Sequence, residues 1–159
     1  MPIGRNLLAR RLPARTMAAL LIILALAVIG AGGAVAQAIV APDAALAMAR
    51  DGQVLIIDIR RPDEWRETGI PTGAERATVR PSRGANRFLR RIAQLTRGDK
   101  DMQIALICAA GVRSKHASRL LRSRGYTGVM DISEGMLGNG KGAGWLRRKL
   151  PVSYCKDCK

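Results

Sequence analysis

The stretch Ile104-Ala105-Leu106-Ile107-Cys108-Ala109-Ala110-Gly111-Val112-Arg113-Ser114 determines how the rest of this sequence is interpreted. Its first four residues form an unbroken apolar run with β-branched members, which is typical of a strand covered on both faces. Beyond Arg113 the apolar residues follow the spacing of an amphipathic helix that ends near Gly125. The stretch therefore predicts a strand, a tight loop and the start of a helix, with Cys108 where the strand ends.

The loop of this stretch suits a negatively charged sulfur. Sites in open α/β sheets form outside the carboxyl ends of the strands. A loop that wraps back at a helix N-terminus directs backbone N–H groups inward and makes an anion-binding nest. Cys108 is therefore expected to exist largely as a thiolate. Gly111 allows the loop to turn tightly, and Arg113 adds a fixed positive charge.

Strands and helices alternate along the chain. Apolar runs predict strands at 54–59, 74–79, 104–107 and 129–132, whereas capping residues and helical periodicity predict helices at 43–50, from residue 61, at 86–97 and at 113–124. This order predicts an α/β fold in which a parallel sheet is flanked by helices on both faces. Asp58 and Arg60, at the end of the first of these strands, are expected to form an ion pair that fixes nearby loops.

At three of these stretches the chain resembles the rhodanese (sulfurtransferase) family. The family's active loop, Cys-x-x-Gly-x-Arg-Ser/Thr, matches residues 108–114 position for position. Residues 54–65 are similar to its first-strand motif, an Asp-x-Arg followed by Glu-Phe/Trp, and residues 125–136 with Gly144-Trp145 and 150–152 are similar to its closing segment. One departure is that 69–74, Gly-Ile-Pro-Thr-Gly-Ala, lacks a histidine that the family often carries and has one residue inserted.

The resemblance covers residues 43–153 and implies a rhodanese-like fold and a sulfurtransferase activity. Cys108 would take sulfane sulfur from a donor such as thiosulfate, hold it as a persulfide and pass it to a thiophilic acceptor. Asp58 and Arg60 would support the site, the 138–144 loop would lie beside it, and no cofactor or metal is implied. The persulfide-binding loop would consist of Ala109, Ala110, Gly111, Val112, Arg113 and Ser114.

Three other functions remain open at this point. Phosphatases and arsenate reductases on a related fold have a His-Cys-x5-Arg loop, which is one residue longer than the loop here. A non-catalytic rhodanese-like binding module is the second alternative. The third is a periplasmic thiol redox protein in which Cys108 exchanges disulfides with Cys155 or Cys158, a pair that otherwise predicts a local disulfide, free thiols or, more weakly, half of a zinc site. His116, the only histidine, is not required by the sulfurtransferase mechanism.

Residues 1–38 have the pattern of a secretory signal peptide or an N-terminal membrane anchor. Four arginines precede a stretch from Thr16 to Pro42 that carries no charge, and Ala-x-Ala cleavage patterns follow its most apolar part. The protein is therefore expected to be exported to the bacterial periplasm, or anchored to the inner membrane and facing the periplasm. Cleavage after residue 38 would remove those arginines and lower the net charge from +15 to +11.

The positive charge is densest between residues 76 and 97, which contain seven arginines. Export and the scarcity of aromatic residues argue against nucleic-acid binding. The basic surface is expected to attract an anionic substrate or an acidic protein partner, or to touch anionic lipid. The expected substrate is a small sulfur-containing anion or a thiol, and the N-terminal segment would contact the membrane if it is uncleaved. Residues 154–159 form a separate C-terminal tail that contains Cys-Lys-Asp-Cys.

Overall fold

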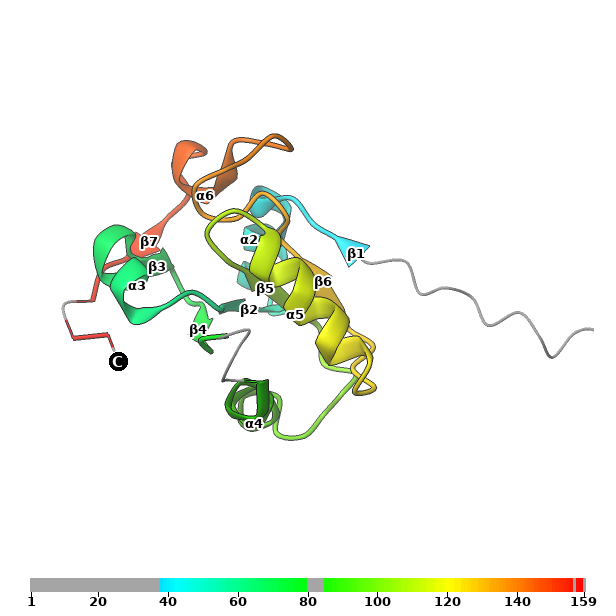
Figure 1. The fold of residues 1–159 in the computed structure, drawn as a ribbon. Helices are drawn as coiled ribbons and strands as arrows, with labels where there is room; N and C mark the ends of the chain where they lie inside the picture. The colour runs from blue at the N-terminus through cyan, green and yellow to red at the C-terminus, as the bar shows by residue number, and fades with distance from the viewer. Residues whose placement is uncertain (1–37, 80–84, 156, 159) are drawn as a thin grey trace, which may run out of the picture. The chain divides into compact units, whose positions relative to one another are not determined.

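The computed structural model describes residues 38–79, 85–155 and 157–158 (Figure 1). Its central sheet has five strands in the order β1-β6-β5-β2-β4, and each neighbouring pair is parallel. The parallel α/β architecture predicted from the sequence is therefore confirmed. The strands are β1 (Ala38–Ile39), β2 (Leu55–Asp58), β4 (Glu75–Arg76), β5 (Ile104–Ile107) and β6 (Val129–Asp131).

The central sheet divides the apolar core into two clusters, one on each of its faces. Side chains alternate across a strand, so successive residues of β5 face opposite sides of the sheet. Ile104, Leu106 and Cys108 join one apolar cluster, whereas Ala105 and Ile107 join the other. All four residues of β5 are buried, as expected for a parallel strand that is covered on both faces.

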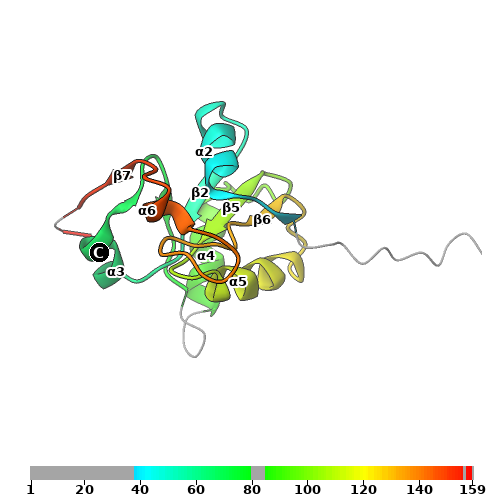
Figure 2. The same ribbon diagram turned by 90° about the horizontal axis from the view of Figure 1, so that it is seen from above.

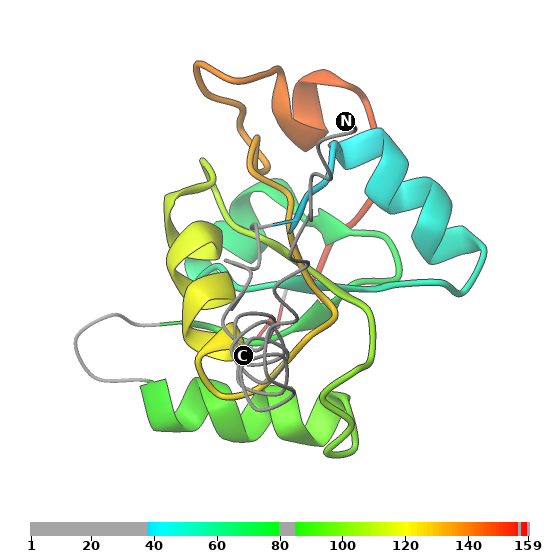
Figure 3. The ribbon, with the colours of Figure 1, turned by 90° about the vertical axis from the view of Figure 1, so that its right-hand side faces the viewer.

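Two pairs of helices cover these faces, as Figure 3 shows from the side. Helices α4 (Ala85–Leu95) and α5 (Val112–Arg122) contribute Phe88, Ile92, Ala117 and Leu121 to the cluster that includes Cys108. Helices α2 (Pro42–Arg50) and α6 (Gly144–Arg147) contribute Leu46 and Trp145 to the other. The predicted covering of both faces by helices is thus observed.

A short antiparallel ribbon lies beside helix α3 (Pro62–Thr68), away from the main sheet (Figure 2). Its strands are β3 (Ile70–Pro71) and β7 (Val152–Ser153). This ribbon was not predicted from the sequence. Its strand β3 falls in the stretch 69–74, where the chain departs from the family pattern. Beyond β7, Cys155 and Cys158 form a disulfide, and Arg66 of α3 donates to the Cys158 carbonyl at 3.0 Å.

Several boundaries differ from those predicted. The strand expected at 74–79 is only two residues long, β4. Beyond it, the amides of Ala77 and Val79 still donate to carbonyls at the end of β2 and just after it. The sheet begins at Ala38, five residues before the predicted start of the domain. The rest of the predicted signal or anchor segment lies outside the described residues. No helix in the described part of the chain combines the length and the apolar character needed to cross a membrane.

Candidate active site

Cys108 follows β5 directly, and its side chain is 1% exposed. The amide of Gly111 donates to its sulfur at 3.2 Å, and the amide of Ser114 donates to the same atom at 3.4 Å. Ser114 Oγ lies 3.5 Å from the same sulfur. Both amides belong to the turn that begins α5, so the positive end of an eleven-residue helix is directed at the sulfur. This arrangement stabilises a negative charge on Cys108.

Residues 132–143, between β6 and α6, wrap the outside of this loop and are called the wrapping segment below. The amide of Met136 donates to the Cys108 carbonyl at 2.8 Å, and the amide of Leu137 donates to the Ala109 carbonyl at 2.9 Å. Asn139 Nδ2 donates to the Ala110 carbonyl at 2.9 Å. The predicted position of the 138–144 stretch beside the active loop is therefore confirmed at Asn139. Three successive loop carbonyls have partners outside the loop.

Two glycines allow the loop and the wrapping segment to approach each other closely. Gly111 has a φ of +81°, a conformation that L-residues with a Cβ rarely adopt. A Cβ on Gly111 would overlap the carbonyl oxygen of Ser133, and a Cβ on Gly135 would overlap the backbone of Ala109. Backbone packs directly against backbone here, so the shape of the loop depends on both glycines.

Arg113 is held beside the loop by Glu64 of α3. Its two terminal nitrogens donate to the two carboxylate oxygens at 2.8 and 2.5 Å, which is the bidentate geometry of strong arginine–carboxylate pairs. Glu64 also accepts from the amide of Arg61 at 2.9 Å, within the capping box of α3. The arginine is thereby fixed at the edge of the loop by a helix that is distant in sequence.

The Glu64–Arg113 pair makes stability depend on pH. Burial raises the pKa of the Glu64 carboxyl, but the hydrogen bonds from Arg113 and the Arg61 amide outweigh this, so the pKa lies below its ordinary value. A carboxyl whose pKa is lowered by folding stabilises the protein above its unfolded pKa. That contribution disappears as the pH falls through the lower folded value.

We expect Glu64→Gln to lower the urea midpoint of unfolding at about pH 7. The difference in midpoint between this variant and the wild type should be smaller at about pH 3. The reason is that the unfolded state binds a proton at this carboxyl below its unfolded pKa, so the wild type progressively loses the contribution of the ion pair as the pH falls toward the lowered folded pKa. Glu75→Gln, which removes an exposed pair with Arg91, is the control and should show a smaller effect at both pH values. An equal difference for Glu64→Gln at both pH values would contradict this account.

Asp58 and Arg60 form the predicted ion pair, and both side chains are almost fully buried. The guanidinium contacts the Asp58 carboxylate at 2.6 Å. It also donates to the Gly69 carbonyl at 2.6 Å, to Thr68 Oγ1 at 2.7 Å and to the Glu64 carbonyl at 3.2 Å. Arg60 therefore joins the end of β2 to both ends of α3, the helix that positions Arg113.

A second buried acid lies under the loop. Asp131 ends β6 and is 1% exposed. Burial raises the pKa of its carboxyl above the ordinary value, and a hydrogen bond with Ser114 and the charges of Lys141, Lys115 and Arg122 oppose this. Ser114 thus lies between the Asp131 carboxyl and the Cys108 sulfur.

The predicted loop residues come together as one site, but three participants were not predicted. Glu64 was expected to have a structural role, and the sequence pattern indicated no role for Asn139 or Asp131. The only available signal was that a family resemblance placed the 138–144 stretch near the loop. Val112 is in the predicted loop but is 65% exposed, at the rim of the site. Within the described residues, no group of three or more His, Cys, Asp or Glu side chains is placed to hold a metal ion.

The family of this protein follows from a comparison that covers the strand, the loop and the wrapping segment together. A model of the rhodanese-like domain family matches residues 41–138. The chain belongs to the rhodanese-like domain family. The matched residues of this rhodanese-like protein include β5, the 108–114 loop and α5.

Three known proteins illustrate the range of its relatives. The uncharacterized protein RP600 of Rickettsia prowazekii is 26% identical over 106 residues, which are 65% of this chain and 86% of the relative. The mitochondrial thiosulfate sulfurtransferase RDL2 of Saccharomyces cerevisiae is 32% identical over 81 residues, 47% of this chain and 54% of the relative. A structure of RDL2 superposes with a TM-score of 0.51 at 23% identity, covering 69% of this rhodanese-like chain and 96% of RDL2.

The third is a Rhodopseudomonas palustris protein of unknown function, RPA3614, described as a possible tyrosine phosphatase. Its structure superposes with a TM-score of 0.53 at 22% identity and covers 90% of this chain and 98% of that one. At this identity the similarity concerns the fold alone.

Proposed function

We propose that this rhodanese-like protein is a sulfurtransferase that carries sulfur as a persulfide on Cys108. The observation that carries the proposal is the pair of backbone amides, of Gly111 and Ser114, that donate to the Cys108 sulfur from the N-terminal turn of α5. Amide donors at this position stabilise negative charge on the sulfur during its attack on a donor, and they remain in place to stabilise charge on a persulfide. The thiosulfate sulfurtransferase RDL2 among its relatives supports the same chemistry.

The reaction divides into two covalent steps. With thiosulfate as the donor, the Cys108 thiolate attacks the outer sulfur and a new S–S bond forms. The bond between the outer sulfur and the sulfonate sulfur breaks, and sulfite leaves with the electron pair. A nucleophilic acceptor then attacks the outer sulfur of the persulfide, and the electron pair of the broken S–S bond returns to the Cys108 sulfur.

Two features of the loop argue against a phosphatase. Arg113 is five residues after Cys108, so the loop is one residue shorter than the phosphatase loop. Both terminal nitrogens of Arg113 are bound to Glu64, whereas a phosphatase needs its arginine to bind the oxyanion. The short loop suits a single sulfur atom better than a tetrahedral phosphate.

The remaining alternatives differ in the state of the thiols. Cys155 and Cys158 are paired with each other and Cys108 is free, which favours a sulfurtransferase over a redox protein that uses all three cysteines. A binding module would not need amides directed at a sulfur atom.

The test is the intact mass of the purified protein after incubation with thiosulfate and removal of small molecules without a reductant. We expect the mass to increase by one sulfur atom, to return to its starting value after cyanide is added, and to stay unchanged in Cys108→Ser. If Cys108 reacts with an alkylating agent yet accepts no sulfur from thiosulfate or inorganic polysulfide, the proposed function is wrong and a binding module is favoured.

A further inference from the structure

Asp131 is a buried acid that the two steps of the proposed reaction do not use. It ends β6, and Val129, two residues earlier, belongs to the apolar cluster that includes Cys108. Side chains two residues apart in a strand point to the same face of the sheet, so Asp131 lies on the side of Cys108 and α5. Strand β6 is paired along both edges, with β5 and with β1. The carboxyl therefore starts from a firmly held backbone.

The Ser114 hydroxyl connects this acid to the sulfur. Ser114 is fully buried, and its Oγ lies 3.5 Å from the Cys108 sulfur and 3.2 Å from the Gly111 carbonyl oxygen. It also forms a hydrogen bond with the Asp131 carboxyl. A hydroxyl has one proton to donate, whereas its oxygen accepts from other groups. Several acceptors therefore compete for a single proton, and the acceptor that receives it depends on what the neighbouring groups donate.

We propose that Asp131 is a positioning residue for sulfur transfer, because it controls the direction of the Ser114 hydroxyl. While its carboxyl is protonated, it donates to Ser114 Oγ, and the hydroxyl proton points at the Cys108 sulfur. Once the carboxyl is ionised it can only accept, so it takes the hydroxyl proton and adds a negative charge near the sulfur.

The inference rests on the proposed function, and it concerns the second covalent step. When an acceptor attacks the outer sulfur of the persulfide, the S–S bond breaks and its electron pair returns to the Cys108 sulfur. A hydroxyl proton directed at that sulfur stabilises the negative charge as it develops. Protonated Asp131 therefore speeds discharge of the persulfide, and ionised Asp131 slows it.

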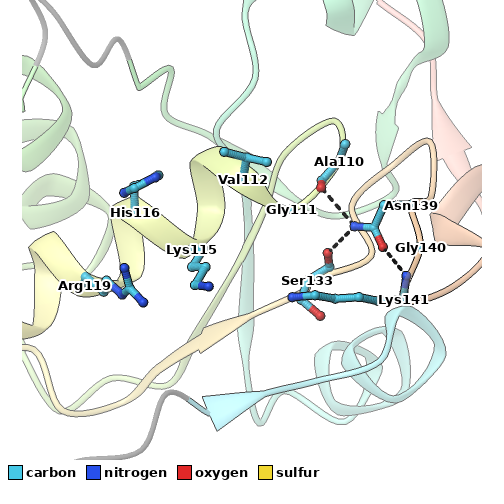
Figure 4. Close-up of a pocket in the computed structure, with 10 residues that line it drawn as sticks. All are labelled: Ala110, Gly111, Val112, Lys115, His116, Arg119, Ser133, Asn139, Gly140 and Lys141. Carbon is cyan, nitrogen blue, oxygen red and sulfur yellow. Dashed lines mark hydrogen bonds between the residues drawn. The ribbon is translucent and has the colours of Figure 1, made fainter.

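Cations from α5 and from the wrapping segment act on this acid. Lys115 and Arg122 belong to α5, and Lys141 belongs to the wrapping segment. Lys115 and Lys141 border a pocket beside the active loop, where their ammonium groups point toward each other (Figure 4). The titratable neighbour after β5 is the Cys108 thiol, and the two residues of β1 on the other edge of β6 carry no charge.

The expected pH response follows from these surroundings. Burial outweighs the Ser114 hydrogen bond and the nearby positive charges, so the pKa of the Asp131 carboxyl lies above its ordinary value. The acid therefore keeps its proton to a higher pH than an exposed aspartate and loses it as the pH rises through the raised value. Below that value the hydroxyl points at the sulfur, and above it the hydroxyl points at the carboxylate.

The experiment compares Asp131→Asn with the wild type. The asparagine amide is close in size to the carboxyl and can donate to Ser114 Oγ at every pH. Cys108 is loaded with sulfur from thiosulfate or, if that fails, from inorganic polysulfide, and loss of the extra sulfur to cyanide is followed by intact mass. We expect Asp131→Asn to discharge about tenfold faster than the wild type at about pH 9, and this ratio of rates to fall toward one as the pH is lowered to about 6.

Two further variants test the path through Ser114. In the Ser114→Ala background, Asp131→Asn should have no effect, because there is no hydroxyl to direct. Ser114→Ala alone should slow discharge about tenfold at about pH 6, and by less as the pH rises, because the ionised acid has already taken the proton.

Ser118→Ala is the matched control. The Ser118 hydroxyl is buried one turn further along α5 and forms no hydrogen bond with the described residues, so this variant should discharge at the wild-type rate. A ratio of rates near one for Asp131→Asn at every pH overturns the inference. An effect of Asp131→Asn that persists without the Ser114 hydroxyl also overturns it, because the acid would then act through its charge alone. A wild type that accepts no sulfur from either donor overturns the proposed function itself.

Discussion

Gly111→Ala is expected to abolish sulfur loading of Cys108 and to lower the free energy of unfolding by about 2–4 kcal/mol. Two effects add together. The backbone of residue 111 has a φ of +81°, which disfavours any residue with a Cβ, and the new methyl group would overlap the carbonyl oxygen of Ser133. The loop must then move away from the wrapping segment. This displaces the amide that donates to the Cys108 sulfur.

Gly98→Ala is a control for the first of these effects alone. Gly98 has the same φ of +81°, but a Cβ there would have nothing within 4 Å. We expect it to cost about 1–2 kcal/mol and to leave sulfur loading unchanged. Urea unfolding measures the stability of both variants, and intact mass after thiosulfate measures their loading. If both variants load sulfur normally, the loop does not need the close contact with Ser133.

Asp58→Ala should destabilise the protein by about 3–5 kcal/mol, the usual cost of leaving one partner of a buried ion pair without its counter-charge. Arg60 is 1% exposed and cannot reach solvent without moving β2 or α3. Its other partners are neutral oxygens of α3 and Gly69, which do not replace a carboxylate. Because α3 also carries Glu64, we expect Arg113 to lose its fixed position and the loading rate to fall.

Asp63→Ala is the matched control, since it removes a carboxylate from the exposed ion pair with Arg61 on the same helix. Exposed pairs contribute little to stability, so its unfolding midpoint should stay close to the wild type. Similar midpoints for Asp58→Ala and Asp63→Ala would show that Arg60 finds solvent or another anion in the folded protein.

Local sequence patterns were sufficient to predict the loop and three strands of the sheet, β2, β5 and β6. The apolar run of β5 has the length and burial that its pattern predicts, and the loop follows from one glycine and the start of a helix. Asp58 and Arg60 were predictable as a pair because two charges at the end of a buried strand need each other.

The contacts between distant segments could not be predicted in this way. Glu64 and Arg113 are 49 residues apart, so no local pattern in the sequence pairs them. The two-residue strands β1, β3 and β7 are too short to have a periodic pattern, and β3 contains a proline that argues against a strand. These elements exist because of their partners in the fold.

The wrapping segment has a consequence for the polarity of the active loop. In a planar trans peptide, the carbonyl and the following N–H point in opposite directions. Partners outside the loop hold the carbonyls of Cys108, Ala109 and Ala110, so the next three amides are turned toward its interior. The wrapping segment thus orients the peptide dipoles of the loop so that their positive ends point toward its interior. Residues that never approach the sulfur, Asn139 among them, therefore govern how well the loop holds a negative charge.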